Sequence, residues 1–137
     1  MASYNGMAFR TPLEARWAAF FDLAHWKWAL NPLPEGNWAP DFRVTLPCEH
    51  SECGGSHTLL ISILAVDDVQ GFKGHPCLTH AYGKGITAIV DAGAGFGTSP
   101  QVTTWEMQHG SGGGIYSVSD WVETADDIWT KAGTLVS

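Results

Sequence analysis

The chain has few basic residues and no long apolar run. Only seven of its 137 residues are Lys or Arg, against 14 Asp or Glu, so the formal net charge is −7. Affinity for a phosphate backbone comes from clustered basic side chains, and the scattered ones here argue against a surface that tracks nucleic acid. No apolar stretch approaches the ~20 residues of a membrane span, and the opening MASYNGMAFR lacks a signal-peptide core. We therefore expect a cytoplasmic protein with no membrane partner.

Cysteine is also scarce, and internal repeats and low-complexity tracts are absent. The three cysteines are Cys48, Cys53 and Cys77, and an odd number without a secretion signal argues against a disulfide framework. A chain of this length corresponds to one domain, and with 45% apolar residues it can bury a core without disulfides or a metal. We expect a single domain over 1–137.

Capping and periodicity predict the elements. Thr11 and Pro12 begin a helix over 12–25, with Glu14 placed to close a capping box. A last helix begins at Ser119 or Asp120 and ends at Gly133. Strands are expected at 26–30, 38–46, 57–66, 86–90, 102–107 and 115–118, with a Gly-rich connection at 91–100 and a hairpin tip at 108–114.

This order of elements indicates an α+β (α/β-like) fold, a mixed β-sheet flanked by an N-terminal and a C-terminal helix. The first two strands form a hairpin, and the run 57–66 is apolar on both faces, as in a central strand. A Cys/His-rich loop, 47–57, is inserted between two strands. Most tryptophans are expected in the core, because those of the helices lie on apolar stripes.

Two stretches carry a family resemblance: FRTPLEARWAAFFD at 9–22 and WAPDF at 38–42. They resemble the small phage-borne and bacterial nucleases of the PD-(D/E)xK superfamily, in which a helix Glu, the Asp of P-D-F and a later E-x-K surround one or two Mg²⁺ ions. The resemblance implies a restriction-endonuclease-like core and a phage or mobile-element origin. It also implies that Glu14 and Asp41 stand at the first two catalytic positions.

The chain departs from this pattern at the E-x-K element. Strand 57–66 is the one that could carry it, and the aligning positions are Ser62 and Leu64. A hydroxyl and an alkyl chain thus replace the third carboxylate and the lysine that would orient or deprotonate the water. Migrated groups are an alternative: Asp67 or Asp68 could supply the acid and Lys73 the cation. Apart from the resemblance, Glu14 is explained as a capping residue and Asp41 as a turn or strand-edge acid.

A second group of chemistry-bearing side chains lies in the loop 47–57. Its spacing, C-x-H-x₂-C-x₃-H, could wrap a tetrahedral Zn²⁺, although it matches no standard zinc finger. His75 or Cys77 could replace one of the local histidines. A polar loop with buried cysteines, or a Cys-His nucleophile pair, are the alternatives. The proposed zinc ligands are Cys48, His50, Cys53 and His57.

Together these patterns predict a catalytically degenerate nuclease-fold module, a pseudoenzyme that binds a protein or nucleic-acid partner. Inhibition of a host defence or nucleic-acid-processing complex is one example, and the acidic charge favours a protein with a basic surface. Two alternatives stay open, an active Mg²⁺-dependent endonuclease with migrated residues and a zinc-stabilised docking protein. No nucleotide cofactor is expected, because the Gly-rich stretch 109–114 lacks the Lys-Ser/Thr of a P-loop.

Overall fold

The computed structural model describes residues 2–32, 39–47, 55–67, 92–109 and 112–137. Within these ranges the element order is β1 (Ala2–Tyr4), β2 (Met7–Phe9), α1 (Pro12–Leu23), β3 (Lys27–Leu30), β4 (Phe42–Pro47), β5 (Ser56–Ile63), β6 (Ala92–Phe96), β7 (Thr103–His109), β8 (Gly112–Tyr116), α3 (Val118–Trp121) and α4 (Ala125–Thr134). None of the helices described in these ranges is long and apolar enough to cross a membrane.

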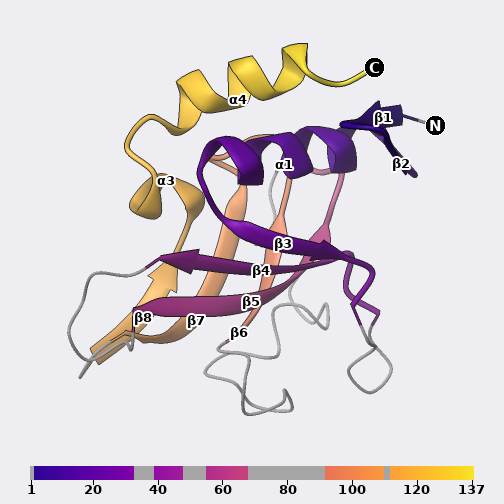
Figure 1. Ribbon diagram of the computed structural model, residues 1–137. Helices are drawn as coiled ribbons and strands as arrows, with labels where there is room; N and C mark the ends of the chain where they lie inside the picture. Colours follow the sequence, from indigo (N-terminus) through magenta and orange to yellow (C-terminus); the bar gives the residue numbers. More distant parts are fainter. Residues whose placement is uncertain (1, 33–38, 48–54, 68–91, 110–111) are drawn as a thin grey trace.

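Most of the strands form one mixed sheet of six, in the order β3-β4-β5-β6-β7-β8 (Figure 1). All neighbours run antiparallel except β5 and β6, which are parallel. The α+β class with a mixed sheet is therefore confirmed, as are the hairpin of β3 with β4 and the interior position of β5. A parallel pair needs a crossover connection. The chain between β5 and β6 comprises residues 64–91, and 68–91 lie outside the described residues.

The opening helix begins where its capping signal predicts. The Thr11 hydroxyl accepts a hydrogen bond from the Glu14 N–H at 3.2 Å. Pro12 occupies the first turn, where backbone N–H groups have no partner within the helix, so its lack of an N–H costs no hydrogen bond. The Glu14 carboxylate forms an ion pair with Arg10. The cap thus holds the first turn of α1 in a set position, and with it the Glu14 side chain.

The helices α1 and α4 lie on the same side of the sheet (Figure 1), and an aromatic core joins them to it. The Trp17 ring lies 4.8 Å from that of Phe96 and 4.5 Å from that of Trp129, between centroids. Its indole N–H donates to the Gly97 carbonyl at 2.9 Å, so the polar atom of this buried ring is bonded. Arg16 lies over the Trp129 ring at 4.1 Å and donates to the Trp129 carbonyl at 2.9 and 3.1 Å, which ties α4 to α1.

A hairpin of β1 and β2 precedes α1, and the sequence reasoning missed it. Its turn is Asn5-Gly6, with φ of 50° and 79°. Positive φ at both central residues is what a two-residue type I′ hairpin turn requires. The Tyr4 hydroxyl donates to Asp22 at 2.6 Å, and burial together with this bond raises the pKa of Tyr4 to about 12. The hairpin is thereby attached to the last turn of α1.

Residues 92–96 form a strand inside the sheet, so the prediction of a Gly-rich connection over 91–100 was wrong. Ala94 pairs with Ile61 on one side and Trp105 on the other, and it is fully buried. Small residues are tolerated there because neighbouring strands supply the bulk. The strand expected at 86–90 lies outside the described residues. The strands flanking the predicted tip 108–114 extend to His109 and from Gly112, so the tip is shorter than expected.

The C-terminal helix predicted from 119 or 120 is two helices, because Val122 is extended (φ −127°, ψ 108°). Asp120 closes the start of α3 by accepting from the Ser117 N–H at 2.7 Å, so the cap lies two to three residues earlier than predicted. Gly133 lies within α4 and does not end it. A Cβ at this position would come 3.0 Å from the Arg16 guanidinium carbon, so the glycine permits a close approach.

Candidate functional site

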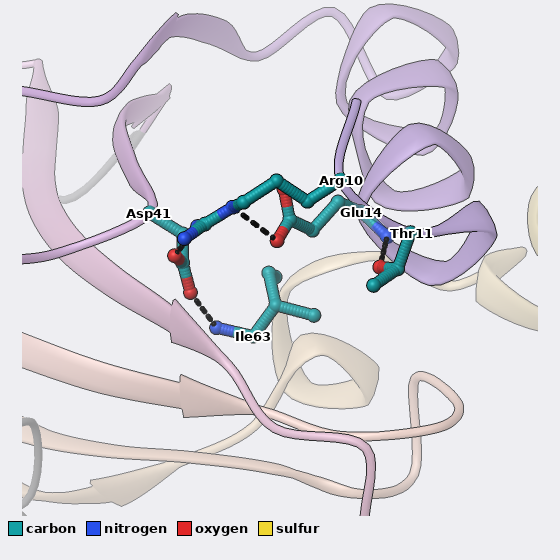
Figure 2. Close-up of polar contacts among 5 residues, drawn as sticks. All are labelled: Arg10, Thr11, Glu14, Asp41 and Ile63. Carbon is teal, nitrogen blue, oxygen red and sulfur yellow. Dashed lines mark hydrogen bonds and ion pairs between the residues drawn. The ribbon is translucent and has the colours of Figure 1, made fainter. Parts of the chain in front are cut away.

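The two acidic residues singled out by the resemblance meet at the N-terminal end of α1 (Figure 2). Glu14 lies in the first turn of the helix and Asp41 directly before β4. Arg10 joins them: its Nε lies 3.2 Å from Glu14 Oε1, and its terminal nitrogen donates to Asp41 Oδ1. Sequence reasoning assigned no role to Arg10. The sequence offered one signal for Arg10: it lies four residues before Glu14, a spacing at which side chains on a helix are close together.

Asp41 is also bound to the sheet. Its Oδ2 accepts from the Ile63 N–H at 2.7 Å (Figure 2), and its own N–H donates to the Ile61 carbonyl at 2.8 Å. One carboxylate oxygen therefore accepts a hydrogen bond from Arg10, and the other accepts one from the backbone of β5. With its side chain 16% exposed, Asp41 has its position set from both sides.

The charges of the three side chains nearly compensate one another. The Glu14 side chain is 9% exposed, and burial raises the pKa of its carboxyl although Arg10 opposes that effect; Asp41 adds to the increase. The carboxylates of Glu14 and Asp41 raise the pKa of Arg10 in turn. The guanidinium thus stands as the cation between two anions, which leaves a formal charge of −1 on the cluster of Arg10, Glu14 and Asp41.

The positions aligned with E-x-K lie beside Asp41. Because Phe42 pairs with Ile61, the register places Ser62 across from Asp41. Ser62 is buried and offers a neutral hydroxyl. Leu64 follows the last residue of β5, is half-buried, and donates its N–H to the Phe96 carbonyl at 2.8 Å. Neither side chain supplies the carboxylate or the ammonium that the nuclease pattern requires.

These residues do not fit a Mg²⁺ site. Magnesium takes near-octahedral oxygen ligands, usually with one or two carboxylates free to bind it. Here both carboxylates are paired to Arg10, and in the described ranges no group of three or more His, Cys, Asp or Glu could hold a metal ion. Asp67 accepts from the Thr98 hydroxyl at 2.7 Å. The other migrated candidates, Asp68 and Lys73, lie outside the described residues.

The predicted zinc ligands are described in part. His57 lies within β5, across from Leu46, and its buried ring packs edge-on against Trp121 with centroids 5.8 Å apart. It is therefore a residue of a strand on the helix-covered face, and the loop between β4 and β5 is shorter than 47–57. The ligands Cys48, His50 and Cys53, and the substitutes His75 and Cys77, lie outside the described residues. The zinc site stays a prediction.

Comparison of the chain with family models, with curated proteins and with solved structures finds no match.

Proposed function

We propose that this chain is a nuclease-fold module that does not cleave phosphodiesters and acts by binding a partner. The observation that carries the proposal is the Arg10 guanidinium between Glu14 and Asp41. In the superfamily that the sequence resembles, carboxylates at the two corresponding positions surround Mg²⁺. In this chain the carboxylates at the same two positions pair with the Arg10 guanidinium.

The architecture supports this proposal at the level of layers and order. An opening helix packs on a mixed sheet, and the strand that follows P-D-F pairs with the strand at which E-x-K would be expected, which is compatible with the proposed core. The position of Asp41 directly before β4, bonded to β5, supports the proposal. What differs is the chemistry of the side chains around it.

Arg10 cannot replace a metal in hydrolysis. A divalent cation lowers the pKa of a bound water and so generates a nucleophile near neutral pH, whereas a guanidinium only donates hydrogen bonds and stays protonated. With Leu64 in place of an ammonium, no group at that position can orient or deprotonate a water. The cluster instead connects the start of α1 with β4 and β5, which is a structural role.

The charge of the chain favours a protein partner with a basic surface. Acidic residues outnumber basic ones by 14 to seven, so a phosphate backbone is repelled while a basic protein surface is attracted. Such complementarity raises association rates and selects among partners more than it raises affinity. Competition with nucleic acid for a basic protein surface is the activity that these charges support.

A plasmid-nicking assay with Mg²⁺ or Mn²⁺ tests the loss of catalysis. We expect no cleavage by the wild-type chain, even at protein concentrations above that of the plasmid. The matched sample is Asp41→Ala, purified in the same way, because a contaminating nuclease would cut equally in both. Cleavage by the wild type that disappears in Asp41→Ala would show an active endonuclease and overturn the proposal.

A further inference from the structure

The six-stranded sheet ends in two edge strands that differ in how they are protected. An edge strand presents unpaired N–H and C=O groups, and proteins block such edges with Lys, Pro, bulges or short strands. At one end, β3 has four residues, begins at the exposed Lys27 and is followed by Pro32. At the other end, β8 is outermost (Figure 1), and among the described strands it pairs with β7 alone. It contains neither Lys nor Pro.

The residues of β8 leave its edge open to another backbone. The five residues of Gly112–Tyr116 are three glycines followed by Ile115 and Tyr116, so the strand carries no charged side chain although the chain as a whole has a net charge of −7. Glycine weakens a strand, and within a sheet it often marks a place where another backbone approaches closely. The glycine run therefore leaves room for a further strand beside β8.

Ile115 stands on the face of the sheet opposite the helices. Side chains alternate between the two faces along a strand, so Ile115 and Tyr116 point to opposite faces. Tyr116 lies across from Trp105 in the register, and Trp105 stacks against Phe96 in the core that joins the sheet to the helices. Ile115 thus faces away from that core. It is 65% exposed, more than any other large hydrophobic residue in the described ranges, and it lies on the strand with the unprotected edge.

Antiparallel pairing of β8 with a second copy of itself matches its large residues to its glycines. When the two strands overlap fully about a two-fold axis at Gly114, Tyr116 lies opposite Gly112 of the second copy, and Ile115 lies opposite Gly113. Residues directly opposite each other share a face of the sheet, so each Ile115 covers a glycine backbone and meets no opposing side chain. The two Ile115 side chains are diagonal neighbours, roughly 7–8 Å apart and within contact reach.

We infer that β8 is a self-association edge, at which two copies of the chain join their sheets into one continuous sheet. The contact is isologous, so the same N–H and C=O groups serve both copies, and no charged side chain of β8 opposes it. A five-residue edge spans about 17 Å, which is small against the roughly 1,000 Å² of a stable interface. The dimer is therefore weak and forms as the concentration rises. This inference does not depend on the proposed function.

Sedimentation of the full chain over a range of concentrations tests the inference. We expect the average mass to rise from the 14.8 kDa of the monomer towards twice that value. Raising NaCl from about 50 to about 500 mM should strengthen association, because salt screens the repulsion between two chains that each carry −7. A chain that stays monomeric up to about 1 mM would overturn the inference. Association that weakens with salt would also overturn it, since such a contact pairs opposite charges.

A charged residue on β8 should block the contact. Ile115→Lys should weaken association at least about tenfold, because it removes an aliphatic contact and brings two ammonium groups close together. Ala29→Lys is the matched control: it makes the same charge change at an exposed residue of β3, the other edge strand, and should leave association unchanged. Equal association of the wild type and Ile115→Lys would place the contact elsewhere and contradict the inference.

A milder variant keeps the test independent of folding. Ile115→Thr retains a β-branched residue that suits a strand, and loss of the aliphatic contact should weaken association about threefold. Association as strong in Ile115→Thr as in the wild type would contradict the inference even if Ile115→Lys failed to fold.

Amide hydrogen exchange of the wild type locates the contact directly. Protection of backbone N–H groups within 112–116 should increase with protein concentration, whereas that of β3 should not change. Association without added protection in 112–116 would show that another surface carries it, and the inference would be wrong.

Discussion

Replacement of Arg10 by Met removes the cation between Glu14 and Asp41 while keeping most of the side chain's volume. Hydrogen bonds between charged groups contribute about 1.5–3 kcal/mol each when well buried. The Arg10 side chain is 65% exposed, so solvent screening reduces each contact towards the ~1 kcal/mol of a surface pair. Because two partly buried carboxylates lose their shared partner, we expect Arg10→Met to lower the free energy of unfolding by about 1–2 kcal/mol.

Urea denaturation at neutral pH measures this loss, and Lys131→Met is the control, since it makes the same charge change on the exposed side of α4. The double variant with Asp41→Asn should lose less than the sum of the single losses, because the two side chains interact. Mn²⁺ should stabilise Arg10→Met and leave the wild type unaffected, since the freed carboxylates can then bind it. An Arg10→Met variant as stable as Lys131→Met, and equally indifferent to Mn²⁺, would refute the reasoning.

Four further outcomes follow from the structure. Gly97→Ala should lower the free energy of unfolding by about 1–3 kcal/mol, measured in urea, because a Cβ there would lie 2.5 Å from Val102 Cγ1; an unchanged midpoint contradicts this. His25→Gly should raise it by about 0.5–1 kcal/mol through relief of the left-handed conformation, and a decrease would show that the histidine makes compensating contacts. Burial raises the pKa of the Glu14 carboxyl above 4.5 in the folded state, so the folded chain binds the carboxyl proton more tightly than the unfolded chain does. The free energy of unfolding of the wild type, relative to that of Glu14→Gln, should therefore decline as the pH rises from 4.5 to neutrality. A difference that is constant with pH would contradict this expectation. Elemental analysis should find about one zinc per chain, lost in Cys48→Ser, and its absence from freshly purified wild type would eliminate the predicted zinc site.

Signals from adjacent residues were sufficient to predict the start of α1 and the interior position of β5. Thr11 and Pro12 define the start of α1 because capping depends on a few adjacent residues. The apolar run of β5 indicated an interior strand because burial on both faces leaves no polar alternation. Such inferences need no knowledge of distant parts of the chain.

Other features depend on neighbours that the sequence does not reveal. The small residues of β6 form a strand because Ile61 and Trp105 flank Ala94 in the folded sheet. Arg10 was visible as a residue four before Glu14, but its contact with Asp41 requires the turn before β4 to lie beside the start of α1. The hairpin at Asn5-Gly6 is different: its turn signal was present and was overlooked.

The backbone bonds between Ser3 and Ser137 have a mechanical consequence. The N–H of each residue donates to the carbonyl of the other, at 3.0 and 2.9 Å. A force pulling the two ends apart would meet this pair before any strand of the sheet, and would then peel the first hairpin and α4 away from α1. Single-molecule stretching should therefore show a small early event, at lower force than rupture of the sheet.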